Sequence, residues 1–443
     1  MKQLIGHAYF EKREYAKALP YLEDYVSRSK KVRREDLYEL SYCYYQAANY
    51  SKSIDGFKQL SGKDDSLSQH AMYLLGDAYL KTGQKSNARN AFLFCASNSS
   101  NPEQKEIAKY QYAKLSYELG FQDEALNSLS SFIADYPNSK YNTEAKDLMV
   151  AVLAGTNNFK DAQAMIESLE KPSDYSKKIY PRILYGRATE LINDGQLSEA
   201  DALLTKVLAD PYNRSVLPLA QFWKGEIGYR NKELDTAIKY YQLYVSAGSP
   251  ASGEANLKNA RYNLGYCYLR KENYPVALSY FEPYSKNPAL NSDAFTQDAY
   301  IRTADCYYMQ KNYTGAKAMY DNVVKFSWPA EDYATFQLAM LAGVKEPKQK
   351  IAMMNTMIRK FPKSSLTTDA NLEIANTYMA DEQFRDAIPY LNNVIQSDVN
   401  ATIKAIAKLK LGTAYYNNDE NENALKQFKE IVSQYPKSPQ AED

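Results

Sequence analysis

The stretch that decides the fold is residues 75–92, LGDAYLKTGQKSNARNAF. It carries a Leu-Gly-x-x-Tyr motif and, nine residues after the tyrosine, an Ala-x-x-x-Phe motif. Both motifs recur with the same spacing at 264–281 and 411–428, which indicates internal repeats. Anchored on the alanine, the register marks twelve positions spaced 34 to 40 residues apart, at Ala18, Ser53, Ala88, Ala125, Ala162, Ala200, Ala237, Ala277, Ala316, Lys350, Ala387 and Ala424.

Two further columns test this register, because they do not enter its definition. A small residue on one helix lets a second helix approach closely, and apolar residues at i, i+3, i+4 and i+7 give each helix a buried stripe. Four residues after the anchor all twelve repeats are apolar, at Leu22, Phe57, Phe92, Leu129, Ile166, Leu204, Tyr241, Phe281, Tyr320, Met354, Leu391 and Phe428. Twelve residues before it ten of twelve are small, the exceptions being Val150 and Leu338. The columns predict a helical hairpin in each repeat, and the period-2 alternation of strands is missing.

The composition limits the classes of function. The 443 residues include 41 Tyr against 15 Phe and 2 Trp, with 54 basic and 53 acidic residues. A net charge of +1 leaves no global field to attract a phosphate backbone, so nucleic acid is not an expected partner. The longest apolar stretch, residues 148–154, is far shorter than the roughly 20 residues that a membrane span needs, so no direct membrane span is expected.

The sequence contains no motif for catalysis, for a metal or for a cofactor. His7 and His70 are the two histidines and lie two repeats apart, and the four cysteines have no CxxC spacing. Residues 248–253 have the glycine spacing of a phosphate-binding loop, but Glu-Ala follows instead of Lys-Ser/Thr, so an inter-repeat loop is expected there. We therefore expect a non-enzymatic protein with no catalytic residue, metal site or cofactor. Small buried packing residues are expected in the slot shared by Cys43, Cys267 and Cys306.

Over essentially its whole length the chain resembles the tetratricopeptide repeat (TPR) family, whose unit of about 34 residues carries Leu-Gly-x-x-Tyr, then Ala-x-x-x-Phe, then Pro. The resemblance implies an all-α fold, a right-handed superhelical α-solenoid of about twelve helix-turn-helix units over residues 1–443. The repeat at about 331–364 departs most, because Lys350 takes the alanine position and Gly343 and Pro347 interrupt it. We expect a short, irregular first helix and a bend there. Residues 439–443 are predicted to open a thirteenth helix, which would make the chain a segment of a longer protein.

A second set of aromatic residues is distinct from the Tyr of the Leu-Gly-x-x-Tyr motif. Its members lie six residues before that Tyr, two before it or one after it, so they form one stripe along the first helix of the repeat. In TPR proteins this stripe lines the concave inner surface, where extended peptides or partner segments bind, so the resemblance implies a partner-binding groove. The alternative is packing between repeats, because neighbouring tyrosines stack on one another. The stripe consists of Tyr38, Tyr42, Tyr45, Tyr73, Tyr110, Tyr117, Tyr185, Phe222, Tyr229, Tyr262, Tyr266 and Tyr308.

The resemblance implies a scaffold or adaptor that binds other proteins or peptides through many modest contacts. A Lys/Asn/Arg clamp for C-terminal carboxylates is not expected, because its positions hold mostly Tyr, aliphatic and acidic residues such as Asp77 and Asp305. Three turns, 136–139, 361–364 and 435–438, place Pro after one helix and a Ser able to N-cap the next. They resemble turns of bacterial cell-envelope TPR proteins, which implies the periplasm or cell envelope. Two alternatives stay open: an envelope protein that binds a saccharide or small ligand, and a regulatory region of a larger enzyme or complex. The pattern indicates no oligomeric state.

Overall fold

The computed structural model describes residues 1–248 and 251–441. In this part the chain forms α-helices and three short 3₁₀ helices, with no strand and one isolated β-bridge between Ser252 and Ala255. The α-solenoid that the sequence predicts is confirmed. The chain divides into two compact units, Met1–Lys224 and Gly225–Asp443, with the boundary inside α13 (Leu217–Arg230). None of the described helices combines the length and the apolar content that crossing a membrane requires.

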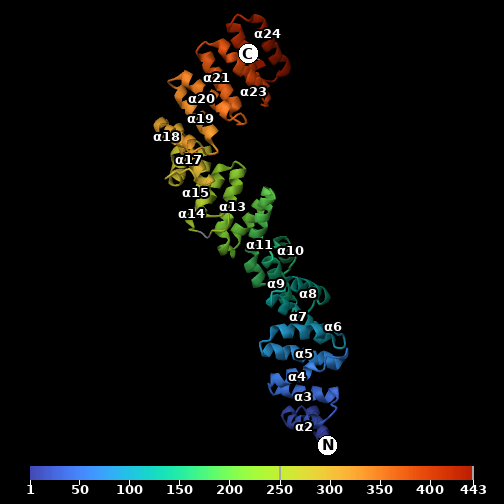
Figure 1. Ribbon diagram of the computed structural model, residues 1–443. Helices are drawn as coiled ribbons and strands as arrows, with labels where there is room; N and C mark the ends of the chain where they lie inside the picture. The colour runs from blue at the N-terminus through green and yellow to red at the C-terminus, as the bar shows by residue number, and fades with distance from the viewer. Residues whose placement is uncertain (249–250, 442–443) are drawn as a thin grey trace. The chain divides into compact units, whose positions relative to one another are not determined.

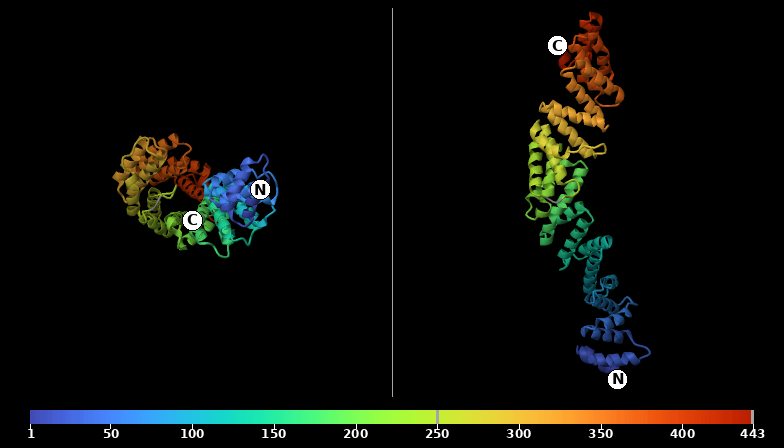
Figure 2. Two further views of the ribbon diagram at one scale, coloured as in Figure 1. Left: turned by 90° about the horizontal axis from the view of Figure 1, so that it is seen from below. Right: turned by 60° about the vertical axis from the view of Figure 1, so that its left-hand side comes forward.

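The first unit contains six consecutive helix pairs and the beginning of α13 (Figures 1 and 2). Consecutive helices from α1 to α12 contact each other, and so do the first helices of neighbouring pairs. The helices are α1 (Lys2–Glu11), α2 (Tyr15–Arg28), α3 (Arg34–Gln46), α4 (Tyr50–Lys58), α5 (Ser66–Lys81), α6 (Lys85–Ser97), α7 (Pro102–Glu118), α8 (Gln122–Asp135), α9 (Asn142–Gly155), α10 (Phe159–Glu167), α11 (Asp174–Asn193), α12 (Leu197–Ala209) and η1 (Asn213–Ser215).

The second unit continues the pairing, and consecutive α-helices from α14 to α24 contact each other. Of the predicted thirteenth helix, residues 439–441 form only a 3₁₀ turn, and 442–443 lie outside the described residues, as do two residues of the loop at 248–253. The elements are α14 (Leu234–Ser246), α15 (Leu257–Arg270), α16 (Tyr274–Phe281), η2 (Glu282–Tyr284), α17 (Ala294–Met309), α18 (Tyr313–Lys325), α19 (Glu331–Gly343), α20 (Pro347–Lys360), α21 (Thr367–Ala380), α22 (Phe384–Gln396), α23 (Ala401–Asn417), α24 (Asn421–Gln434) and η3 (Pro439–Ala441).

The two sequence columns meet inside the five hairpins whose small residue is glycine. A Cβ atom added to Gly76 of α5 would lie 2.8 Å from the ring of Phe92 in α6, and one added to Gly412 of α23 would lie 2.5 Å from the ring of Phe428 in α24. Because real Cβ atoms do not approach other atoms so closely, only a residue without a side chain fits there. The small column therefore exists to admit the large apolar residue of the partner helix, as the sequence predicts.

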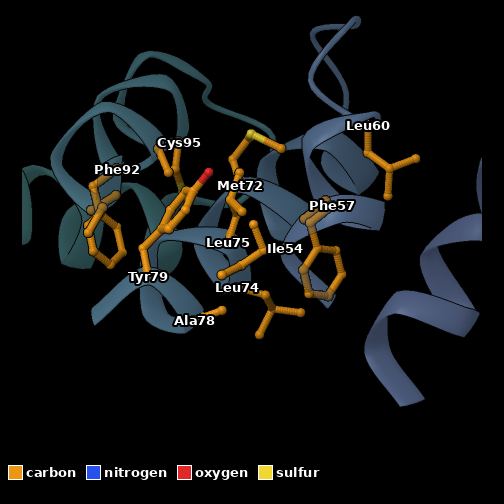
Figure 3. Close-up of a cluster of buried hydrophobic side chains, with 14 of the residues drawn as sticks. Ile54, Phe57, Leu60, Met72, Leu74, Leu75, Ala78, Tyr79, Phe92 and Cys95 are labelled. Atoms are coloured by element: carbon orange, nitrogen blue, oxygen red, sulfur yellow. The ribbon is translucent and has the colours of Figure 1, made fainter. Parts of the chain in front are cut away.

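The hydrophobic core runs between consecutive helices, as Figure 3 shows for α4 to α6. Phe57 from α4 and Phe92 from α6 lie on either side of a row of α5 side chains, which includes Leu75 and Tyr79. The cysteines also belong to the core: all four are buried, and burial raises the pKa of each thiol to about 12. The predicted packing role of Cys43, Cys267 and Cys306 is confirmed.

Eleven of the hairpin turns in the described residues share one backbone conformation, in which the first helix ends in a Schellman motif. In the turn between α5 and α6, for example, the backbone N–H of Gln84 donates to Tyr79 O at 2.8 Å, and that of Gly83 donates to Leu80 O at 3.0 Å. Each motif needs one residue of positive φ, a conformation that favours glycine. Glycine fills it in only three turns; the residues are Arg13, Ala48, Gly83, Gly120, Asn157, Gly195, Lys232, Glu272, Lys311, Glu382 and Asp419.

The repeat at 331–364 is irregular in its turn and not in its first helix. The predicted short, irregular first helix is wrong, because α19 has 13 residues, as many as α3. Pro347 does not interrupt a helix; it is the first residue of α20, where a missing N–H removes no helical hydrogen bond. The turn between α19 and α20 lacks a positive φ, and the stem of Lys350 packs where Gly343 leaves room, within 2.5 Å of a Cβ placed there.

The serines of the Pro turns do not act as N-caps. Ser139 Oγ accepts a hydrogen bond from the backbone N–H of Tyr141 at 3.1 Å, and α9 begins one residue later, at Asn142. Ser364 Oγ likewise accepts from the N–H of Leu366 at 3.2 Å, directly before α21. The predicted N-cap is therefore displaced by two residues, because the serine closes the turn itself instead of the first turn of the helix.

Candidate functional site

The predicted stripe lies on the first helices and is only partly accessible. Tyr110 and Phe222 are 1% and 2% exposed, so these two belong to the core. A half-buried ring can contact both a neighbouring helix and a bound partner, so the surroundings of each ring distinguish the two predicted roles. The remaining ten residues are half-buried: Tyr38, Tyr42, Tyr45, Tyr73, Tyr117, Tyr185, Tyr229, Tyr262, Tyr266 and Tyr308.

In the first unit, five rings from α1, α3 and α5 form a continuous surface, which we call the aromatic face: Phe10, Tyr38, Tyr42, His70 and Tyr73. Ring centroids lie 5.6 Å apart for Phe10 and Tyr42 and 5.9 Å apart for Tyr38 and Tyr42. The His70 ring lies 5.7 Å from that of Tyr38 and 6.4 Å from that of Tyr73. At such separations aromatic rings attract one another, so the face crosses three consecutive first helices without a break.

Two members of the aromatic face were not predicted. Phe10 directly follows the Tyr of its own motif, the offset that Tyr45 also has, so the sequence contained the signal. His70 lies three residues before Tyr73 and therefore on the same side of α5. Its Nδ1 pairs with the side-chain amide of Gln104, and burial lowers the pKa of His70, which keeps the imidazole neutral at pH 7.

The tyrosine hydroxyls of the face are not all engaged. Among the described residues, none forms a hydrogen bond with the hydroxyl of Tyr38 or Tyr73, and neither oxygen is sealed from solvent. Burial raises the pKa of both phenols, so both stay protonated. Tyr45 differs, because its hydroxyl donates to Asp77 of the next first helix, a carboxylate that also lies 3.6 Å from Lys81 Nζ. Tyr45 therefore connects two repeats, whereas Tyr38 and Tyr73 keep a free polar tip.

Farther along the first unit the stripe serves packing. The ring of Tyr110 stacks on that of Tyr141 with centroids 4.5 Å apart. The Tyr185 hydroxyl accepts a hydrogen bond from Trp223 Nε1 at 3.2 Å. Tyr117 packs against the core cluster around Leu129. In this stretch the inter-repeat interpretation accounts for Tyr110 and Tyr185, whereas the hydroxyl of Tyr117, like those of Tyr38 and Tyr73, has no hydrogen-bond partner among the described residues.

The second unit contains a counterpart of the aromatic face. Tyr262 and Tyr266 of α15 occupy the positions that Tyr38 and Tyr42 occupy in α3, six and two residues before the motif Tyr. In the first helix of the following repeat, Asp298 stands at the position that corresponds to His70. The hydroxyls of Tyr262 and Tyr266 both donate a hydrogen bond to the Asp298 carboxylate, the one from Tyr266 at 2.5 Å. Burial and this carboxylate raise the pKa of Tyr266 to about 12. The hydroxyls of Tyr262 and Tyr266 therefore form hydrogen bonds within the protein.

The same carboxylate belongs to a larger polar network in the second unit. Arg302 Nη1 lies 2.7 Å from Asp305 Oδ2, and its Nε lies 3.4 Å from Asp298 Oδ1. Asp305 also accepts hydrogen bonds from the hydroxyls of Tyr320, at 2.6 Å, and Tyr333, at 2.9 Å. Burial raises the pKa of Asp305, although the guanidinium and both hydroxyls oppose the shift. These groups come from α17, α18 and α19, so the network fastens consecutive helix pairs together.

The other stripe residues of the second unit and of α13 also face neighbours. The guanidinium of Arg270 lies 4.1 Å from the ring centroid of Tyr229, close enough for a cation–π contact. The ring of Phe222 meets that of Trp223 edge to face at 5.4 Å, and Tyr308 meets Tyr313 at 5.7 Å. The partner-binding role of the full stripe stays a prediction, and only part of the stripe presents accessible rings with free hydroxyls.

The described residues hold no cluster of potential metal ligands. No group of three or more His, Cys, Asp or Glu side chains in residues 1–248 and 251–441 is arranged to hold a metal ion. His7 Nδ1 lies 2.6 Å from Glu39 Oε1, an ion pair that joins α1 to α3 when the imidazole is protonated.

Four segments of the chain match family models. Residues 306–442 match a tetratricopeptide repeat-like domain, and residues 185–252, 108–139 and 69–100 each match a tetratricopeptide repeat. A comparison with curated proteins gives no match.

Three solved structures match the chain at low sequence identity. A tetratricopeptide repeat protein from Parabacteroides merdae is 17% identical, with a TM-score of 0.43 over 59% of this chain and 96% of that chain. The APC/C hetero-tetramer Cut9-Hcn1 is 13% identical, with a TM-score of 0.36 over 99% of this chain and 94% of that chain. Naa15/Naa10 bound to HypK-THB is 14% identical, with a TM-score of 0.41 over 96% of this chain and 67% of that chain.

Proposed function

Because the chain belongs to the tetratricopeptide repeat family, whose repeats build scaffolds for protein–protein interaction, we propose that it holds partner proteins against the aromatic face of the first unit. It does so without catalysis. A partner segment that lies across α1, α3 and α5 contacts five rings at once, so its affinity comes from several modest contacts.

The observation that carries this proposal is the difference between two equivalent tyrosine pairs. The hydroxyls of Tyr262 and Tyr266 both donate to Asp298, whereas the Tyr38 hydroxyl has no partner in the described residues. Tyrosine supplies a large apolar area and a polar tip at low cost in conformational entropy, which is why it is enriched in recognition surfaces. Free tips on half-buried, mutually supported rings are what a preorganised binding surface requires.

A crosslinking pull-down with the full chain as bait tests the proposal. The double variant Tyr38→Ala/Tyr73→Ala should lose the partners that the unaltered chain captures, while its helical circular dichroism signal stays the same. The matched control Phe121→Ala/Tyr212→Ala removes two aromatic residues that are 48% and 43% exposed and lie outside the face. The control should capture the same partners as the unaltered chain. Equal capture by both double variants would refute the aromatic face as the binding surface.

A saccharide is the competing ligand, because aromatic rings with hydroxyl tips also suit sugar rings. Glycan-array hits that disappear in Tyr38→Ala/Tyr73→Ala, together with an empty pull-down, would replace the protein partner by a saccharide. We also propose that the scaffold acts in the cell envelope, on the basis of the Pro-x-Ser turns at 136–139 and 361–364. Fractionation of cells that produce the native protein would test this, and recovery with the cytosol alone would refute it.

A further inference from the structure

The aromatic face is uncharged, which narrows the class of partner. Burial lowers the pKa of His70 and raises that of Tyr38, so both rings are neutral at pH 7. Asp77 is a carboxylate on α5, the helix of His70. It accepts a hydrogen bond from the Tyr45 hydroxyl and forms an ion pair with Lys81. A charged side chain placed on such a face would lose its water without gaining a counter-ion. The face therefore suits an apolar segment whose polar groups are those of its backbone.

The separation expected for packed helices agrees with the advance per turn of one backbone conformation. Its rings come from α1, α3 and α5, which contact each other in order. Packed helices lie roughly 8–10 Å apart. A polyproline II segment has three residues per turn and a rise of about 3.1 Å per residue, so it advances about 9 Å per turn. Every third residue of such a segment would therefore meet the next first helix.

The hydrogen-bonding groups also match. A polyproline II backbone has no internal hydrogen bonds, so its carbonyl oxygens are exposed along its whole length. The hydroxyls of Tyr38 and Tyr73 are donors without a partner in the described residues, and both rings lie beside that of His70. Aromatic surfaces that bind polyproline II exploit this preformed, low-entropy conformation.

We infer that the partner segment is proline-rich and binds in the polyproline II conformation, with every third residue set against the rings of α1, α3 and α5. The inference rests on the proposed function and adds the chemistry of the partner. The rings supply the apolar contact, and the free hydroxyls of Tyr38 and Tyr73 donate to backbone carbonyls of the segment.

Isothermal titration calorimetry of the full chain with a ten-residue polyproline peptide tests the inference, with (Gly-Ser)₅ as the control peptide. Polyproline should bind and (Gly-Ser)₅ should not. Tyr38→Ala/Tyr73→Ala should weaken the Kd about tenfold or more, since truncation of an aromatic anchor costs over about 1 kcal/mol. Tyr38→Phe/Tyr73→Phe keeps the rings and removes only the two donors, so it should weaken the Kd about fivefold.

A third variant, His70→Asp, guards against variants that merely unfold. It places in α5 the residue type that the second unit has at the corresponding position of α17, Asp298. There the counterpart tyrosines, Tyr262 and Tyr266, donate their hydroxyl hydrogen bonds to this carboxylate. The variant should keep its helical circular dichroism signal and bind polyproline at least about tenfold more weakly, because the Tyr38 donor is consumed and a charge is added to the face. Phe121→Ala/Tyr212→Ala should bind as the unaltered chain does.

Equal binding of the two peptides, or polyproline binding that none of the face variants weakens, would overturn the inference. Absence of polyproline binding, with pull-down capture still dependent on Tyr38 and Tyr73, would overturn the proline-rich partner and leave the proposed function standing. Loss of that dependence in the pull-down would overturn the proposed function itself. The two experiments therefore separate the failure of one claim from the failure of the other.

Discussion

Gly265 offers the sharpest test of how the hairpins are held together. A Cβ atom at this position of α15 would lie 2.8 Å from Cε1 and Cζ of Phe281 in α16. The Phe281 side chain is fully buried, and its ring meets those of Tyr262 and Tyr266 edge to face at 5.7 and 5.3 Å. Because the ring is held on two sides, it cannot withdraw from an added methyl group without disturbing the whole hairpin.

The expected cost of Gly265→Ala follows from two opposing effects. Overpacking a buried site costs roughly 1–3 kcal/mol, and the higher helix propensity of alanine returns about 1 kcal/mol. Because the Phe281 ring cannot withdraw, the overpacking cost should lie in the upper part of this range, at about 2–3 kcal/mol, so the net loss of stability should be about 1–2 kcal/mol. At Gly62, where no atom lies within 4 Å of an added Cβ, the same substitution should change stability by less than about 0.5 kcal/mol.

Hydrogen exchange read by mass spectrometry is the suitable assay, because long repeat arrays do not unfold in one cooperative step. Amides of residues 257–281 should exchange about five- to thirtyfold faster in Gly265→Ala, while those of α3 and α4 should not change. The double variant Gly265→Ala/Phe281→Leu should regain part of the loss, since the smaller side chain makes room. Exchange as slow as in Gly62→Ala, or a coupling below about 0.5 kcal/mol between the two positions, would refute the steric explanation of the small column.

Three further predictions follow from the packing. Iodoacetamide at pH 8 should alkylate Cys267 more than about a hundredfold more slowly in the folded chain than in urea, because burial raises the pKa of the thiol to about 12; equal rates would contradict its burial. Ala48 has a φ of +55°, so Ala48→Gly should stabilise the hairpin by about 0.5–1 kcal/mol and slow hydrogen exchange in α3 and α4. Val344 lies in the turn without a positive φ, so Val344→Gly should destabilise its hairpin by a similar amount. A stability change of the same sign in both variants would contradict the turn assignment. Asp305→Ala should destabilise α17 to α19 by about 3 kcal/mol, because it leaves the Arg302 charge without its closest partner. Asp321→Ala is the control, because it removes only the exposed ion pair of Asp321 with Lys317 and should lower the stability by less than about 1 kcal/mol. Equal losses of stability in Asp305→Ala and Asp321→Ala would refute the network.

The hairpins could be predicted because their determinants recur in the sequence at a fixed spacing. Gly76 and Phe92 lie sixteen residues apart, as do Gly265 and Phe281, and the structure places each pair in direct contact. The turns were less predictable, since Ala48 adopts a positive φ that composition would assign to glycine. There the Schellman hydrogen bonds of the hairpin impose the conformation on whichever residue occupies the position.

The division of the tyrosine stripe could not be predicted from the first helices alone. Tyr38 and Tyr262 occupy the same register, but the residue in one slot of the following repeat differs. That slot holds His70 after the first tyrosine and Asp298 after the second. Whether a hydroxyl is free therefore depends on a side chain 32 to 36 residues later, which a reading of one repeat at a time does not consider.

The contacts between repeats also bear on how such a chain folds. The hydrogen bond from Tyr45 to Asp77 spans 32 residues, and that from Tyr262 to Asp298 spans 36. Because the helices of residues 1–248 and 251–441 contact near neighbours along the chain, the contacts between these helices close only short loops, and the entropy cost of closure is similar for every repeat. Contact order, as a fraction of length, falls as repeats are added, so an array of this kind can be lengthened by whole repeats without the slow folding that distant pairings impose on large proteins.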